Sequence, residues 1–406
     1  MKTLFINILF LLGLVSCVPS EINSPDKNWD IVSYWEQVKG DSVIVTPIDK
    51  IKAEMNIPLE ILSEEYQVIK LDNGANLSHR LSDVFISDNY IALSNGSHPL
   101  KLFKRDGTFI REIGALGNKK GQYDYVIDVQ INEIENQIYI LPNHTTGGES
   151  NGILVYNLQG IFLQEIPLFN KSMYGSAFKV NSSKDEIIII SSLMQQFPNR
   201  YYIWVQDKNG NFKYGLYPGH KKTDLYCAQN VLSLNHTESM ETFLLYGGNG
   251  TLYNGEINEE YLSHYNKEEN RLIPKFRVLT QNNGIFIYEL PFYYIVEEGM
   301  DSYRGIEHIQ ANKSIIDKRT LKSCRFSGFI TPEGLLLDQY DILFKTHDGY
   351  FSLVEQESQI LERIQRINKK DLTKKQKEGL DKLQHMIEED AEDGFLLFMA
   401  KFKTKE

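Results

Sequence analysis

A short string recurs along the first half of the chain: a β-prone run, a turn that ends in glycine, and a second β-prone run. It reads LFKRDGTFIREI from Leu102, VYNLQGIFLQEI from Val155 and WVQDKNGNFKYGL from Trp204. Glycine reaches positive φ without steric cost, and Asp and Asn favour turns, so each string predicts a hairpin. Successive hairpins predict an antiparallel, all-β architecture.

Each hairpin forms the second half of a unit with four β-prone runs. The three regular units place these runs at residues 81–87, 89–94, 100–104 and 108–113; at 125–131, 137–141, 152–157 and 161–166; and at 177–180, 186–191, 201–206 and 212–216. Four strands in a period of about 40 to 55 residues are what a blade of a β-propeller requires. The sequence therefore predicts a propeller.

The second half of the chain repeats this plan more loosely. A fourth unit is expected at 230–234, 241–246, 261–265 and 272–279, and a fifth at 292–296, 305–309, 314–317 and 323–330. A run at 335–344 follows, and the apolar run 394–402 is expected to pair with residues 66–71, which would close the ring and remove exposed sheet edges. We predict six four-stranded blades within residues 41–406, with five or seven as alternatives.

A helical segment interrupts the last unit. Residues 371–389 contain no proline, and Leu380, Leu383 and Ile387 fall on one face at helical spacing. Thr373 and Gln376 have the spacing of a capping box, which predicts the start of the helix. We expect this short C-terminal insertion to pack on the outside or rim of the closing blade.

The N-terminus has the features of a secretory signal. Lys2 precedes an apolar run that ends at Val15, too short for the roughly 20 residues that a membrane-spanning helix needs. Cys17 directly follows Leu-Val-Ser, an arrangement that resembles the bacterial lipoprotein box, in which the cysteine is acylated and the chain is cut before it. We predict a signal peptide at 1–16 and a lipidated tether at 17–40; a plain secreted protein with an incidental Cys17 is the alternative.

Composition limits the classes of partner. The formal charge is −11, from 43 Lys and Arg against 54 Asp and Glu, so no basic field attracts nucleic acid. Hydrophobic residues make up 42% of the chain, which predicts a folded core rather than disorder.

After processing, Cys227 and Cys324 remain. An oxidising compartment permits a disulfide between them, and two buried thiols are equally consistent with the sequence.

No known catalytic motif occurs. The sequence lacks His-Glu-x-x-His, Cys-x-x-Cys, Gly-x-Ser-x-Gly and a Gly-Lys-Ser/Thr phosphate loop, and the loop GALGNKKG at 114–121 is expected to be a turn between blades. We therefore predict no cofactor and no metal. Surface positions or strand-end hydrogen bonds are the favoured explanation for six further candidates, although side chains from different units could still converge on the propeller axis: His79, His144, His236, His308, Asp83 and Asp128.

Two aromatic clusters are candidate ligand-binding sites. Tyr201, Tyr202 and Trp204 form the first, and Tyr293 and Tyr294 form the second. Aromatic rings beside hydroxyl groups suit recognition of glycans or peptides. Because Tyr, Phe and Trp also have high β-propensity, packing within the blades is the alternative explanation.

The residues of the first unit resemble a known family. The lead-in Ile48-Asp49-Lys50, the stretch NYIALSNGSHPLKLFKRDGTFIREIG and the following Gly117 to Tyr123 are similar to six-bladed β-propeller lipoproteins of Gram-negative bacteria, which are NHL-like in outline. Lys119-Lys120-Gly121-Gln122-Tyr123 departs from the Gly-Pro-Gly-Glu-Tyr of that family. The resemblance implies an outer-membrane lipoprotein, facing the periplasm or the surface, and supplies no catalytic residues.

Two functions are consistent with these features. The first is a non-catalytic binding module, anchored by lipid in the cell envelope, that takes a glycan, a peptide or an envelope protein in nutrient acquisition. The second is an envelope hydrolase or lyase with its site at the mouth of the central channel. Three or more converging His, Asp or Glu side chains would favour the enzyme, whereas aromatic and neutral polar groups would favour binding. A purely structural role remains a third alternative.

Overall fold

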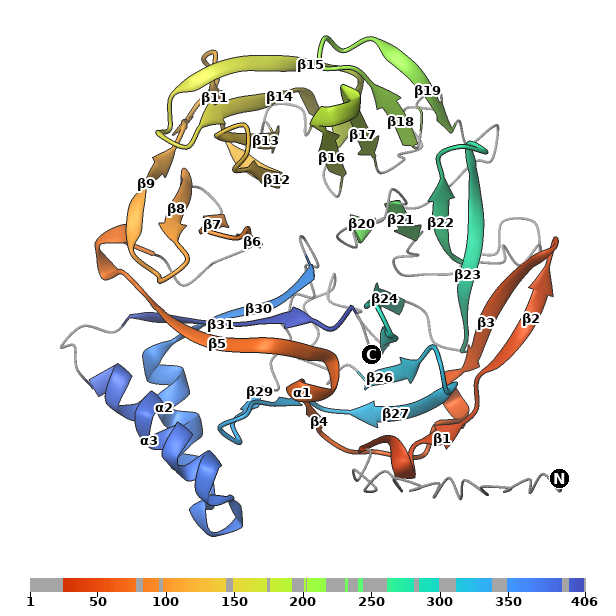
Figure 1. The fold of residues 1–406 in the computed structure, drawn as a ribbon, viewed down its shortest axis with the longest axis vertical. Coiled ribbons are helices and arrows are strands. Elements are labelled where there is room, and N and C mark those ends of the chain that lie inside the picture. The colour runs from red at the N-terminus through yellow and green to blue at the C-terminus, as the bar shows by residue number, and fades with distance from the viewer. Residues whose placement is uncertain are drawn as a thin grey trace, which may run out of the picture.

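The computed structural model describes residues 25–77, 83–94, 98–143, 149–173, 176–191, 201, 203–216, 231–232, 240–243, 261–280, 285–298, 312–337, 349–388 and 394–404. Its sheets follow one another around a ring, with strands β6, β12, β16 and β20 nearest the centre (Figure 1). The architecture is the predicted all-β propeller.

The three regular units of the sequence form three four-stranded antiparallel blades. Blade 1 contains β6 (Asp83–Ile86), β7 (Tyr90–Ser94), β8 (Leu100–Lys104) and β9 (Phe109–Ile113). Blade 2 contains β12 (Tyr125–Asn132), β13 (Gln137–Asn143), β14 (Glu149–Asn157) and β15 (Phe162–Met173). Blade 3 contains β16 (Ala177–Asn181), β17 (Glu186–Ile190), β18 (Ile203–Gln206) and β19 (Phe212–Leu216).

The next two blades are widened by N-terminal strands. Blade 4 contains β20 (Val231–Leu232), β21 (Met240–Phe243), β22 (Leu262–Asn266) and β23 (Arg271–Leu279), and the hairpin of β2 (Tyr34–Val38) and β3 (Asp41–Pro47) joins its outer side, with β3 parallel to β23. Blade 5 contains β24 (Ile285–Glu289), β25 (Tyr293–Glu298), β26 (Asn312–Asp317) and β27 (Lys322–Phe326), with β1 (Asp30–Ile31) at its outer edge.

Blade 6 closes the ring with strands from both ends of the chain. The strand β31 (Phe395–Phe402) lies between β30 (Tyr350–Gln356) and β5 (Ser63–Leu71), and the pairing of Phe395 with Leu71 confirms the predicted closure. Two small sheets complete the described strands: β4 (Ile57–Pro58) with β28 (Phe329–Ile330) and β29 (Leu336–Leu337), and β10 (Ala115–Leu116) with β11 (Gln122–Tyr123).

The hydrophobic core is divided among the seams between blades. The buried clusters lie one at each seam from 1/2 to 4/5, one between blades 5 and 6, and one between blades 6 and 1, and each takes side chains from the two neighbouring blades. The cluster between blades 5 and 6 also contains side chains from the helices and from the small sheet of β4, β28 and β29. A blade therefore buries both of its faces, and the described chain has one core for each seam of a six-bladed ring. This is the packing that a twisted sheet needs when it has neighbours on two sides.

The glycine of the recurring string has a structural reason. Gly107, Gly160 and Gly210 all have positive φ, and a Cβ at any of them would approach a carbonyl oxygen in the outer strand of the preceding blade. At Gly107 that Cβ would lie 2.1 Å from the Lys70 oxygen, in the closing strand β5. The Asp72 amide also donates to the Gly107 oxygen at 3.0 Å. The glycines therefore let adjacent blades approach backbone to backbone.

We expect Gly107→Ala to destabilise the protein more than Gly40→Ala. The φ of Gly40 is +92° and that of Gly107 is +90°, so both substitutions carry similar strain of about 1–2 kcal/mol. A Cβ at Gly40 meets nothing within 4 Å, whereas one at Gly107 overlaps β5, which adds about 1–3 kcal/mol. Chemical denaturation of both variants measures the difference; equal losses would show that the contact between blades 6 and 1 relaxes without cost.

The helices lie outside the ring beside blade 6 (Figure 1). They are the short α1 (Leu59–Leu62), α2 (Glu357–Arg366) and α3 (Lys374–Glu388). The predicted capping box is present: the Thr373 amide donates to Gln376 Oε1 at 2.9 Å, and the Gln376 amide donates to Thr373 Oγ1 at 3.3 Å. Leu380, Leu383 and Ile387 are buried against blade 6, as their spacing predicts.

Other expectations need correction. The tether expected over 17–40 ends earlier, because Lys39 and Gly40, both at positive φ, form a hairpin turn that brings β2 into blade 4. The predicted fifth unit begins at 292 and omits strand β24, which is the first strand of blade 5. The turn at 290–292 that follows β24 reads Leu-Pro-Phe, and without glycine or asparagine it gives no turn signal in the sequence. Strand β30 and helix α2 were also missed. Residues 305–309, most of 335–344, the signal peptide and Cys17 lie outside the described residues.

Candidate functional site

The propeller has two unlike faces. Antiparallel order places the turns between first and second strands and between third and fourth strands at one end of each blade, which we call the turn face. The links between second and third strands, and those between blades, lie at the other end, which we call the connection face. In blade 1 the Arg105 amide donates to the Asn89 oxygen at 3.0 Å, so its two turns do lie together.

Chain length is distributed unequally between the faces. The turn face uses short turns throughout blades 1 to 3 and in blade 5, at 87–89, 105–108, 133–136, 158–161, 182–185, 207–211, 290–292 and 318–321. Three links between second and third strands span 191–202, 244–261 and 299–311 in the sequence, and nearly all of these residues lie outside the described part of the chain. Long segments held by a rigid scaffold are where binding residues usually occur, so the connection face is the candidate binding face.

The turn face is occupied by polar contacts that cross the seams. These contacts are a cation–π pair of Arg105 with Tyr350 between blades 6 and 1, hydrogen bonds from Asn89 to Glu133 between blades 1 and 2, an ion pair of Lys208 with Glu135 between blades 2 and 3, one of Lys267 with Glu186 between blades 3 and 4, and one of His264 with Glu289 between blades 4 and 5. Charged side chains on this face therefore hold blades together.

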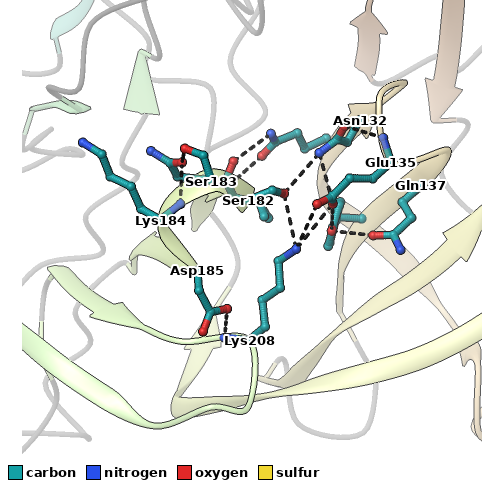
Figure 2. Close-up of polar contacts among 12 residues, drawn as sticks. Asn132, Glu135, Gln137, Ser182, Ser183, Lys184, Asp185 and Lys208 are labelled. Atoms are coloured by element: carbon teal, nitrogen blue, oxygen red, sulfur yellow. Dashed lines mark hydrogen bonds and ion pairs between the residues drawn. The ribbon is translucent and has the colours of Figure 1, made fainter.

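The seam between blades 2 and 3 shows how dense these contacts are (Figure 2). Lys208 Nζ lies 3.3 Å from Glu135 Oε1 and 3.3 Å from Ser182 Oγ. Asn132 Nδ2 donates to Glu135 Oε2 and to Ser182 Oγ, each at 3.2 Å. The Tyr139 hydroxyl donates to Glu135 Oε2 at 2.8 Å. Glu135 is thus the shared acceptor of this network.

The network fixes the charge of Glu135. Burial alone would raise the pKa of this carboxyl, but hydrogen bonds from Tyr139 and Ser182 and the charge of Lys208 bring its pKa below the ordinary value. Burial and the hydrogen bond to Glu135 raise the pKa of Tyr139. An ionised carboxylate surrounded by donors from two blades suits a structural tie better than a proton-transfer group.

A second cluster lies at the seam between blades 4 and 5. The Glu289 carboxylate, 2% exposed, contacts His264 Nε2 at 2.9 Å through one oxygen and Lys318 through the other. Lys318 Nζ also lies 4.5 Å from the centre of the Tyr294 ring. Beside it, Arg319 lies over Phe292 and pairs with Asp317 at 2.7 Å. This cluster brings a histidine, a lysine and a buried carboxylate together on the turn face.

Only part of the candidate His and Asp set falls within the described residues. Within the described ranges, no three His, Cys, Asp or Glu side chains are grouped so that they could hold a metal ion. Asp128 accepts from the Phe178 amide of the next blade at 2.9 Å, so its role is the strand-end hydrogen bond. His79, His144, His236 and His308 lie outside the described residues.

The predicted aromatic sites are largely buried. Trp204 is 0% exposed and its Nε1 donates to Gln206 Oε1 at 3.0 Å, while Tyr293 and Tyr294 are 7% and 3% exposed. Rings without exposed faces cannot stack on a ligand, so the structure corrects the binding assignment of these three in favour of packing. Tyr201 packs against Phe212 with ring centres 4.8 Å apart. Tyr202 lies outside the described residues.

Cys324 is a buried free thiol, and burial raises its pKa to about 11. Its partner in the suggested disulfide, Cys227, lies outside the described residues.

The sequence patterns did not identify Glu289 and Lys318 as a cluster, or Tyr34 and Trp35 as strand residues. Glu289 ends β24, the strand that was missed, so no pattern linked it to His264. The hairpin at 34–47 carried a usable signal: two β-prone runs joined by Lys39-Gly40. Reading it would have placed Tyr34 and Trp35 on an edge strand instead of in a tether.

Comparison with known proteins supports the architecture. The model of the family DUF5128, described as "6-bladed beta-propeller", matches residues 40–253. A crystal structure of a "Putative exported protein" from Bacteroides fragilis is 13% identical, with a TM-score of 0.57 over 86% of this chain and 98% of that one. A DUF4221 member from Bacteroides vulgatus is 12% identical, with a TM-score of 0.45 over 84% and 97%. A search of curated proteins finds no match.

Proposed function

Because the chain belongs to the DUF5128 family of six-bladed β-propellers, we propose that it is a non-catalytic binding module, anchored by lipid in the cell envelope. The connection face would take a glycan, a peptide or an envelope protein in nutrient acquisition. The inequality between the two faces carries this proposal. The described turns of blades 1 to 3 and 5 are short and tied across seams on one face, whereas three links of the other face are longer in the sequence, a length that suits recognition.

The proposed location rests on the N-terminus. Cys17 follows Leu-Val-Ser at the end of a short apolar run, as in lipoproteins that are acylated at cysteine. The similar Bacteroides fragilis protein is described as a "Putative exported protein", which supports an address outside the cytoplasm for this chain too. None of the described helices has the length and apolar character needed to cross a bilayer. We propose the outer membrane as the site of attachment.

We expect a ligand found by thermal-shift screening to bind at the connection face. The screen uses defined panels of oligosaccharides, peptides and divalent metals, since a ligand that binds only the native state raises the melting temperature by mass action. Replacing residues 244–261 by a short Asn-Gly turn should abolish the shift for a ligand that this segment recognises. Retention of native circular dichroism shows that the variant still folds.

Lys208→Met is the matched control on the turn face. It removes the ion pair with Glu135, which costs at most about 1 kcal/mol, and should leave the ligand-induced shift unchanged. If Lys208→Met abolishes the shift and the exchange of 244–261 does not, the two faces have been assigned the wrong way round. A melting temperature that falls with chelator would instead support the metal-assisted hydrolase or lyase.

A further inference from the structure

An exposed apolar patch follows the proposed tether along the chain. Ile31 is 72% exposed, Trp35 56% and Tyr34 45%, so three large apolar side chains lie open to solvent within five residues. They belong to β1 and β2, which lie on the outside of the ring at blades 5 and 4 (Figure 1). We call these three residues the rim patch.

The rim patch lies close to the proposed anchor along the chain. Fourteen peptide units separate Cys17 from Ile31, a span of at most about 50 Å. A lipidated Cys17 would therefore keep β1 and β2 near the bilayer. Tyr and Trp favour the membrane–water interface, because their rings are apolar at one end and polar at the other.

Basic and acidic side chains both lie near the rim patch. Along the chain, the exposed Lys27 precedes it and the exposed Lys39 follows it. Two nearby carboxylates are already engaged: Asp30 accepts from the Lys52 and Ala53 amides at 2.6 and 2.7 Å, and Asp41 pairs with Arg271 at 2.8 Å. Asp30 and Glu36 are acidic residues beside these lysines, so the apolar side chains and not a local positive charge carry the proposed contact.

We propose that the rim patch inserts into the headgroup region of the bilayer that holds the lipid anchor. The inference rests on the proposed lipidation. Lipid and rim patch together make two points of attachment, so the ring stands on its edge with its axis along the membrane plane. The connection face then opens sideways, and a ligand reaches it without passing between the ring and the bilayer.

Tryptophan fluorescence tests this contact specifically. The chain has three tryptophans, of which Trp29 is 5% exposed and Trp204 is 0% exposed, so Trp35 is the one that lipid can reach. The full-length lipidated protein is reconstituted into phosphatidylethanolamine and phosphatidylglycerol vesicles, with or without phosphatidylcholine brominated near the headgroup. We expect bromolipid to remove about a third of the emission, the share of one ring in three. Trp35→Phe should abolish this quenching, and Ile31→Ser with Tyr34→Ser should reduce it.

Leu163→Ser is the matched control, because Leu163 is also on an outer strand and 47% exposed but lies on blade 2. It should leave quenching unchanged. Flotation with the vesicles separates the two proposals. Protein that floats without quenching of Trp35 overturns the rim contact and leaves the anchor intact. Protein that does not float overturns the anchor, and the inference that rests on it.

Discussion

Replacing Phe398 by alanine is expected to lower the free energy of unfolding by about 3–5 kcal/mol, because truncating a fully buried phenylalanine leaves a cavity. Phe398 is 0% exposed and lies in β31, the middle strand of the closing blade. Its neighbours come from β30 on one side and β5 on the other, where it pairs with Leu353 and Val68. A loss here weakens the joint that holds the two ends of the chain.

Phe169→Ala is the matched control for Phe398→Ala. Phe169 is also on a strand, β15, but it is 45% exposed and lies at an outer edge. Its truncation removes contacts with Tyr201 and Phe212 and should cost no more than about 1.5 kcal/mol. Denaturant titration of both variants gives the comparison. Similar losses would show that blade 6 contributes no more to stability than an exposed edge.

The second large effect is expected from Lys313→Met. Lys313 Nζ lies 3.5 Å from Glu297 Oε1, and each side chain is only 5% exposed. Removing one partner of a buried ion pair leaves an uncompensated charge in a low dielectric, which costs about 3–5 kcal/mol. Replacing both, by Lys313→Met with Glu297→Leu, should restore most of the stability, because buried pairs are often replaced by apolar residues at little cost.

The loss in Lys313→Met should depend on pH. Burial raises the pKa of Glu297 above its ordinary 4.5, and Lys313 opposes that shift, so the pKa rises further when the lysine is absent. The folded state then binds more protons than the unfolded state between the two pKa values, and stability falls as pH rises through this window. The variant should therefore be least stable near neutral pH and recover as the pH falls towards 4.5.

Lys101→Met separates burial from charge in this experiment. Lys101 is 4% exposed and lies 2.8 Å from Glu112, but the Glu112 side chain is 47% exposed and stays hydrated when the lysine is lost. The cost should be smaller than for Lys313→Met and should depend less on pH. A loss for Lys313→Met that is constant from pH 5 to pH 8 would contradict the role assigned to Glu297.

Much of the fold could be predicted because its strongest constraints are local. The glycines of Arg-Asp-Gly, Leu-Gln-Gly and Lys-Asn-Gly mark the turn between the third and fourth strands of blades 1 to 3. These glycines are Gly107, Gly160 and Gly210, and each recurs because its φ is positive and a Cβ there would approach the preceding blade. Thr373 and Gln376 likewise cap α3 as their spacing indicates. Closure could also be predicted, since an apolar run at 394–402 with no other partner needs a strand beside it.

The features that the sequence did not predict depend on contacts between residues far apart in the chain. Trp204 and Tyr294 resemble ligand-stacking rings in sequence, and only the neighbouring blade shows them to be buried. His264 and Glu289 meet across a seam, which no local pattern encodes. The hairpin of β2 and β3 joins blade 4 through β23, more than two hundred residues later, so its residues appeared to be part of a tether.

The closing blade also determines when this protein can fold. Strand β5 pairs with β31, and the paired residues Leu71 and Phe395 are more than three hundred positions apart, so β5 has no sheet partner until β31 has been synthesised. The hairpin of β2 and β3 must likewise wait for β23. Pairings over such separations fold slowly and leave strand edges exposed meanwhile. Blades 1 to 3 can assemble from neighbouring segments as they emerge, while the ring stays open until its final strand arrives.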